Sequence, residues 1–147
     1  MFKIAMCVRE NRKSASRNKI NTPISVYNQI KNIEEMQQEC MLALTVNTKN
    51  KLIDIHLITL GILDASLVHP REVFKNAILD SAWGVVIAHN HPSGDLTPSP
   101  EDIRITRQLV DAGRILDIRI LDHIIISKQD NGSNNFFSLR ESGMVSF

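Results

Sequence analysis

The chain has 147 residues, a formal charge of +1, 43% hydrophobic and 22% charged residues, which is the composition of an ordinary globular domain. Its longest unbroken apolar run, from Ala82 to Ala88, is far shorter than the about 20 residues that a membrane-spanning helix needs. The two cysteines, Cys7 and Cys40, form neither a disulfide framework nor a CxxC zinc motif. We therefore expect one domain in a reducing cytoplasm, without a membrane anchor.

Positive charge is concentrated at the N-terminus. Residues 1–22 contain six basic side chains and one acid, a local charge of +5, so the remaining residues sum to −4. We expect a basic N-terminal arm over 1–22, followed by a single domain over 23–147. The arm is either a solvated tail or a DNA contact. The signal for DNA is weak, because no aromatic side chains are interleaved with the charges.

The first half of the domain predicts one helix and a pair of strands. Ser25 can cap a helix with an apolar face of Val26, Ile30 and Ile33. A strand over 39–46, a polar turn over 47–50 and a second strand over 52–60 then indicate an antiparallel pair. On the second strand we expect one apolar face made of Ile53, Ile55 and Leu57.

Helices and strands alternate in the second half. Pro70 opens a helix whose apolar stripe is expected to be Phe74, Ala77 and Ile78. Residues 83–88 are apolar on both faces and predict a central strand. Ser99 caps a third helix that Gly113 is expected to close, and strands over 118–127 and 136–139 follow. This order predicts a mixed α/β fold, a single, mostly antiparallel mixed sheet flanked by helices.

The residues that carry chemistry lie between this central strand and the third helix. His89 and His91 are two apart on an extended segment, so both imidazoles point to one side while Asn90 points away. Ser99 and Asp102 are three apart at a helix start, share a face, and place the carboxylate where the helix dipole favours it. Two imidazoles, one carboxylate and an open fourth position match a catalytic zinc site.

Such a site needs further groups, and some of these residues have a structural role as well. A nearby carboxylate must carry the proton of the zinc-activated water, and the Ser99 hydroxyl could donate to the developing oxyanion. Ser99 and Asp102 also match a helix capping box, and both roles can hold at once. For His123, beside Asp122, a structural role and hydrogen-bonded support of a metal ligand both stay open.

In this segment the sequence resembles the JAMM, or MPN-type, metalloprotease domain. His89 and His91 are followed by seven residues, Ser99, two residues and Asp102, as in the signature of that family. More narrowly the chain resembles the RadC family over residues 24–142, through segments 68–75, 88–95 and 122–125. The resemblance implies a JAB/MPN (cytidine-deaminase-like) fold and one zinc ion per chain, held by His89, His91 and Asp102, with Ser99 assisting at the oxyanion.

The resemblance also implies a catalytic glutamate on an early strand. Glu39, at the start of the first predicted strand and 50 residues before His89, matches that position. Glu72, in the helix before the histidine strand, is the alternative. We predict that Glu39 is the general base and then the general acid.

The function that the resemblance implies is a zinc-dependent metallohydrolase acting on a peptide or isopeptide substrate. The alternative is a DNA-repair-associated, nucleic-acid-binding accessory protein of the RadC family, and a third is a scaffold domain without catalysis. Longer family members have an N-terminal helical region linked to DNA. Here the resemblance to the family begins at residue 24, just after the basic arm, so we expect a short, stand-alone form. Its oligomeric state has no signal in the sequence.

Overall fold

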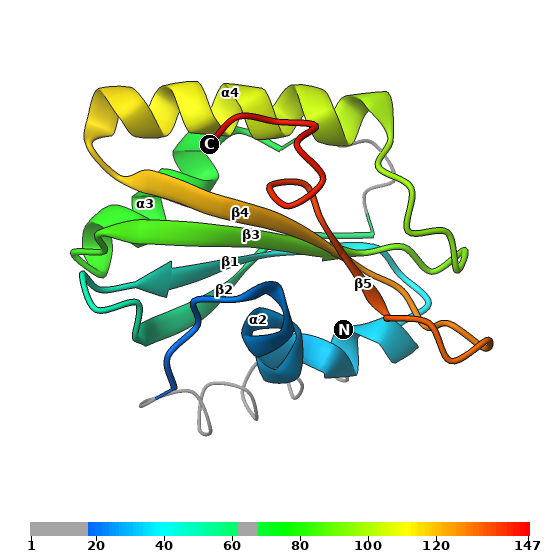
Figure 1. Ribbon diagram of the computed structural model, residues 1–147. Coiled ribbons are helices and arrows are strands. Elements are labelled where there is room, and N and C mark those ends of the chain that lie inside the picture. The colour runs from blue at the N-terminus through cyan, green and yellow to red at the C-terminus, as the bar shows by residue number, and fades with distance from the viewer. Residues whose placement is uncertain (1–17, 62–67) are drawn as a thin grey trace.

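One mixed sheet organises the part of the chain that the structure, a computed structural model, describes: residues 18–61 and 68–147. Residues 1–17, most of the expected basic arm, and 62–67 lie outside the described residues. The helices are α2 (Pro23–Ile30), the 3₁₀ helix η1 (Lys31–Glu35), α3 (Pro70–Leu79) and α4 (Pro100–Leu116). The strands are β1 (Cys40–Val46), β2 (Leu52–Leu60), β3 (Gly84–Asn90), β4 (Arg119–Ile126) and β5 (Phe136–Ser138) (Figure 1).

The sheet has the strand order β2-β1-β3-β4-β5. Strands β3 and β4 are parallel, and every other neighbouring pair is antiparallel. This arrangement confirms the predicted fold class, including the antiparallel pair β1–β2 and the central position of β3. All seven residues of β3 are buried, as expected for a strand that is covered on both faces.

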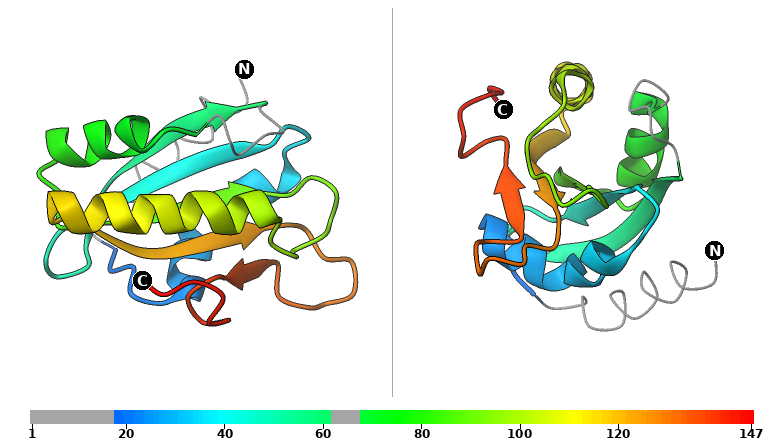
Figure 2. Two further views of the ribbon diagram at one scale, coloured as in Figure 1. Left: turned by 90° about the horizontal axis from the view of Figure 1, so that it is seen from above. Right: turned by 90° about the vertical axis from the view of Figure 1, so that its right-hand side faces the viewer.

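Helices cover both faces of the sheet (Figures 1 and 2). On one face, α2 and η1 pack through Val26, Ile30 and Ile33. On the other face, α3 and α4 pack through a second apolar cluster that includes Phe74 and Leu109. No helix in the described ranges is both long enough and apolar enough to cross a membrane.

Residues 18–22, the described end of the expected arm, run along the sheet. Ile20 is buried, and its N–H donates to the carbonyl of Asn50 over 2.8 Å. The N–H of Leu52 donates to the carbonyl of Asn18 over 3.1 Å. This short stretch therefore packs against the turn between β1 and β2 before α2 begins.

Two helix ends differ from the prediction. Thr22, not Ser25, is the N-cap of α2, and Ser25 is the partner that completes a capping box with it. Helix α4 does not close at Gly113 but continues to Leu116, and Asp117 ends it in the left-handed conformation, with φ of 55°. Gly113 has a different reason to be glycine, because a Cβ there would clash with the carbonyl oxygen of Ile118.

Two predicted apolar faces were also partly wrong. On β2, Ile55 is fully buried, but Ile53 and Leu57 are each 38% exposed. Strand β2 is at the edge of the sheet, and its pairing with β1 has two register irregularities that interrupt simple alternation. On α3, Ile78 is 57% exposed, and Val73 is buried in its place.

We predict that Gly113→Ala destabilises the protein. The new methyl group would collide with the backbone at the start of β4, and overpacking of this kind costs about 1–3 kcal/mol. The better helix propensity of alanine returns at most about 1 kcal/mol. Urea denaturation should show a lower free energy of unfolding, whereas Asp111→Ala on the exposed side of α4 should change it little. Equal stability of Gly113→Ala and the wild type would contradict the close approach.

Candidate metal centre

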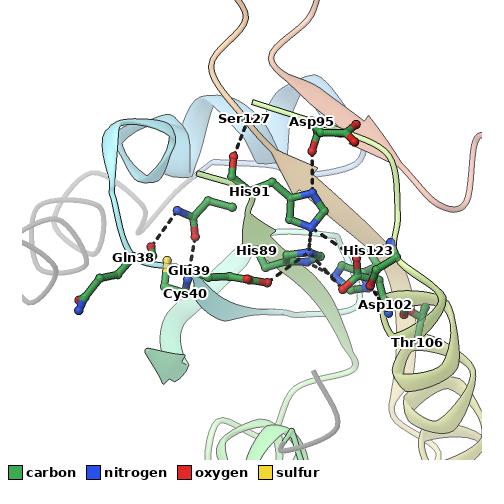
Figure 3. A network of polar contacts seen from close by, with 12 residues as sticks. Gln38, Glu39, Cys40, His89, His91, Asp95, Asp102, Thr106, His123 and Ser127 are labelled. Atoms are coloured by element: carbon green, nitrogen blue, oxygen red, sulfur yellow. Dashed lines mark hydrogen bonds and ion pairs between the residues drawn. The ribbon is translucent and has the colours of Figure 1, made fainter. Parts of the chain in front are cut away.

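The end of β3 brings two imidazole rings together. His89 and His91 lie on the same side of the chain, and their Nε2 atoms are 2.8 Å apart (Figure 3). Asn90 points the other way, where its Oδ1 accepts from the Cys40 N–H over 2.7 Å and its Nδ2 donates to the Gln38 carbonyl over 3.0 Å. The alternation predicted for this segment therefore holds.

The first turn of α4 places a carboxylate beside both rings. Asp102 Oδ1 lies 3.4 Å from His89 Nε2, and Oδ2 lies 3.4 Å from His91 Nε2. The Asp102 N–H donates to Ser99 Oγ over 3.0 Å, and the Ser99 N–H donates to Asp102 Oδ2 over 2.8 Å. The predicted capping box is thus present, and it holds the Asp102 carboxylate towards the histidines. Ser99 uses its oxygen in this box, so its own O–H proton can be donated elsewhere.

A second carboxylate approaches from the other side. Glu39 immediately precedes β1, and its Oε1 lies 4.0 Å from His89 Nε2 (Figure 3). The amide of Asn90 bonds to the backbone on both sides of Glu39, which fixes the start of β1 against the end of β3. Glu72 has a 54% exposed side chain that pairs with Arg71, and no ion pair of the described residues joins it to a histidine. The geometry therefore favours Glu39 over Glu72.

Backbone and second histidine contacts orient the two rings. His91 Nδ1 is 2.7 Å from the carbonyl oxygen of Asp95. Because a carbonyl only accepts, Nδ1 carries the proton and a neutral His91 presents a lone pair at Nε2. His89 Nδ1 is 2.7 Å from His123 Nε2, so its Nε2 is likewise the atom that faces the shared space.

The donor set fits a zinc ion. With metal–ligand bonds of about 2.0–2.2 Å, a tetrahedral ion separates its ligand atoms by about 3.3–3.6 Å. The two separations between Asp102 and the histidines, both 3.4 Å, lie in this range. The Nε2 atoms of His89 and His91 are closer, at 2.8 Å, so these two nitrogen atoms share either a proton, in an N–H···N hydrogen bond, or a metal ion. A carboxylate oxygen of Glu39 and one ring nitrogen of each histidine also lie within 4.8 Å of one another, close enough for the three to hold a metal ion together.

Electrostatics give the two carboxylates different properties. Burial raises the pKa of Glu39, and the neighbouring His89 and His91 only partly oppose this shift. Burial alone would also raise the pKa of Asp102, but hydrogen bonds with His89 and His91 hold it far below its usual range. Asp102 therefore stays an anionic ligand candidate, while Glu39 is the better proton acceptor.

Two residues behind the centre had little or no signal in the sequence. His123 is fully buried on β4, next to His89. Thr106 on α4 is 2.6 Å from His123 Nδ1, and the sequence analysis missed it. Its position four residues after Asp102, on the same face of the helix, is the signal that could have identified it.

A second His/Asp group has a simpler explanation. His56 Nε2 is 2.6 Å from Asp80 Oδ2, with Asp54 at 3.9 Å. The Thr45 hydroxyl donates to the same Asp80 oxygen over 2.6 Å. Asp80 follows α3, so these bonds fasten the end of that helix to β1 and β2, which is a structural role.

Comparisons with known proteins agree with the resemblance. A family model described as RadC-like JAB domain matches residues 20–144. A UPF0758 protein of Methanococcoides burtonii is 47% identical over 112 residues, 76% of this chain and 47% of the relative. One of Geobacillus thermodenitrificans is 51% identical over 110 residues (75% and 46%), and one of Clostridium botulinum is 43% identical over 134 residues (90% and 57%). This chain thus spans about half the length of the curated relatives it matches.

We predict that Ser99→Ala destabilises the fold whatever the chemistry of the centre. The variant removes the oxygen that accepts the Asp102 N–H, and loss of an N-cap side chain costs about 1 kcal/mol. Ser99→Thr keeps a capping oxygen and should retain most of the stability. Chemical denaturation of both variants in the presence of a chelator would measure the effect. A Ser99→Ala variant as stable as the wild type would contradict the capping role.

Proposed function

The chain belongs to the RadC-like JAB domain family, and on that premise we propose that it is a zinc-dependent metallohydrolase that cleaves peptide or isopeptide bonds. The observation that carries the proposal is the convergence of two ring nitrogens, 2.8 Å apart, on the carboxylate at the start of α4. A second carboxylate with a different protonation behaviour stands opposite. This is the set of groups that metal-assisted hydrolysis requires.

His89, His91 and Asp102 are the residues that would hold the zinc ion. When bound, zinc lowers the pKa of a water molecule to about 7 and polarises the substrate carbonyl. Glu39 accepts a proton from the attacking water and then donates it to the leaving amine, which its raised pKa favours. The Ser99 hydroxyl donates to the carbonyl oxygen as negative charge develops there.

Access to the centre is from the side of Glu39 and His91. The side chains of Glu39 and His91 are 22% and 14% exposed, whereas those of His89 and Asp102 are almost fully buried. A substrate carbonyl would therefore meet Glu39 and His91 first. The buried residues would keep the metal fixed and shielded on its inner side.

We predict about one zinc ion per purified chain, the single site that the motif describes. His89→Ala and Asp102→Ala should each lose the metal, because each removes a ligand. Glu39→Gln should keep the zinc but lose hydrolysis of a fluorogenic isopeptide, because it removes only the proton acceptor. Metal content by mass spectrometry, together with the hydrolysis rate, measures both effects.

The exposed Glu72→Gln variant is the matched control and should be unchanged in zinc content and rate. Full zinc content in both His89→Ala and Asp102→Ala would refute the ligand assignment. Loss of activity in Glu72→Gln, with Glu39→Gln active, would reverse the assignment of the base.

A second candidate function, nucleic-acid binding in association with DNA repair, has one structural observation in its favour. A hollow of about 530 Å³ is lined by Arg114, Arg119 and Arg140. The Arg119 guanidinium lies 5.4 Å from the ring centroid of Trp83. Among the described residues, neither Arg119 nor Arg140 forms an ion pair with a carboxylate. The Arg119 guanidinium beside the Trp83 ring, with Arg140 lining the same hollow, suits a single-stranded, phosphate-bearing ligand.

Fluorescence anisotropy with a single-stranded oligonucleotide tests this second function. Arg119→Ala/Arg140→Ala should weaken binding and flatten its dependence on salt, by about 0.7 log unit per log unit of salt for each phosphate that the variant no longer neutralises. The control, Arg71→Ala/Arg104→Ala, removes two arginines that pair with glutamates elsewhere. Deletion of residues 1–17 measures the contribution of the arm separately. Wild-type protein that does not bind, or equal effects of the two double variants, would exclude this hollow as the binding site.

A further inference from the structure

Behind the candidate metal centre, a continuous chain of hydrogen bonds joins three elements. His89 Nδ1 on β3 is 2.7 Å from His123 Nε2 on β4. His123 Nδ1 is 2.6 Å from Thr106 Oγ1 on α4, and the Thr106 hydroxyl donates to the carbonyl of Asp102 over 2.5 Å. Figure 3 labels the side chains of His89, His123 and Thr106. They are at most 1% exposed, so this chain of hydrogen bonds is closed to solvent.

The direction of these bonds follows from the last acceptor. The Asp102 carbonyl has no proton, so the single hydroxyl proton of Thr106 must point to it. Thr106 Oγ1 is then the acceptor in its contact with His123, and His123 Nδ1 carries a proton. The direction of the Thr106 hydroxyl proton therefore determines where the protons of His123 and then of His89 lie.

The neutral form of His123 completes the assignment. The polar partners of its ring in the described part of the chain are Thr106 and His89, with no carboxylate in hydrogen-bond contact. A charged ring at this buried position would therefore lack a paired anion, which is strongly unfavourable. With its proton on Nδ1, a neutral His123 accepts at Nε2, and so His89 donates from Nδ1.

We propose that Thr106 and His123 are positioning residues that fix the tautomer of His89, so that its Nε2 lone pair always faces the space shared with His91 and Asp102. The opposite tautomer would place a proton at Nε2, which would donate to His91 Nε2 over 2.8 Å and block a cation from that nitrogen. This relay of hydrogen bonds, from Asp102 through Thr106 and His123 to His89, starts at the backbone carbonyl of Asp102, whose side chain enters the same centre. Helix α4 thus supplies one candidate ligand and orders the proton on another.

The tautomer assignment rests on the hydrogen bonds and on the burial of His123 without a paired anion, and its value for metal binding rests on the proposed function. Thr106→Val keeps the shape of the side chain but removes the oxygen that accepts from His123. A buried N–H without a partner is unfavourable, so the variant favours the other His123 tautomer. In that tautomer His123 carries its proton on Nε2 and donates it to His89 Nδ1. His89 Nδ1 is then an acceptor, so a neutral His89 carries its own proton on Nε2. Thr106→Ser keeps the hydroxyl and is the matched control.

Long-range proton–nitrogen NMR correlations of the histidine rings test the relay in metal-free protein at alkaline pH. Wild type and Thr106→Ser should show His89 and His123 protonated at Nδ1. Thr106→Val should show a mixture with the Nε2 tautomers. Competition with a zinc chelator should give a zinc affinity about 10–100-fold weaker for Thr106→Val, and one close to wild type for Thr106→Ser.

The outcomes separate the relay from the proposed function. A wild-type His89 protonated at Nε2 overturns the relay, even if the protein binds zinc, and needs no variant to show it. Unchanged tautomers and zinc affinity in a folded Thr106→Val overturn it as well. Wild-type protein with the expected tautomers but no zinc binding supports the relay and contradicts the metallohydrolase.

Discussion

The close approach of two imidazole nitrogens is the constraint on which the rest of the site depends. His89 Nε2 and His91 Nε2 are 2.8 Å apart, a distance at which a proton or a metal ion must lie between their lone pairs. The nearby structure is arranged to orient both rings and to place an anion beside them. Asp102 provides an anion with a strongly lowered pKa, and the Asp95 carbonyl and His123 fix the outer nitrogens of the rings.

The topology of the sheet explains why these groups meet. Strand β1 is antiparallel to β3, so it starts where β3 ends, and Met41 pairs with His89. Strand β4 is parallel to β3, so both strands finish at the same end of the sheet, where Ile125 pairs with His89. The chain leaves β3, makes one loop and returns as α4, whose N-terminus faces this end. Glu39, the histidines and Asp102 are therefore collected at one end of three adjacent strands.

How far the sequence could predict this site depends on the separation of the residues. His89, His91, Ser99 and Asp102 lie within 14 positions, and local periodicity alone predicts that the two histidines share a side and that Ser99 caps the helix. Glu39 is 50 residues before His89, so only the resemblance identified it, since strand pairing has no local signal. Thr106 was missed because a buried threonine in a helix resembles any core residue until His123 is placed beside it. Gly113 was misinterpreted for the same reason, because its close contact is with the backbone of Ile118, just before the next strand, and no sequence pattern shows that contact.

The double role of Asp102 decides which residues can serve as evidence for chemistry. A serine and an acid at the positions of Ser99 and Asp102 form a capping box in any protein, so their hydrogen bonds would also exist in a scaffold domain without catalysis. No helix cap needs a buried imidazole paired with a half-buried one, a third imidazole behind them, or a glutamate across from them at the strand start that Asn90 anchors. Buried polar groups of this kind are unfavourable unless their protons and charges are matched. A cation between His89, His91 and Asp102 is the simplest way to match them, which makes the polar groups outside the capping box the stronger support for the proposed hydrolase.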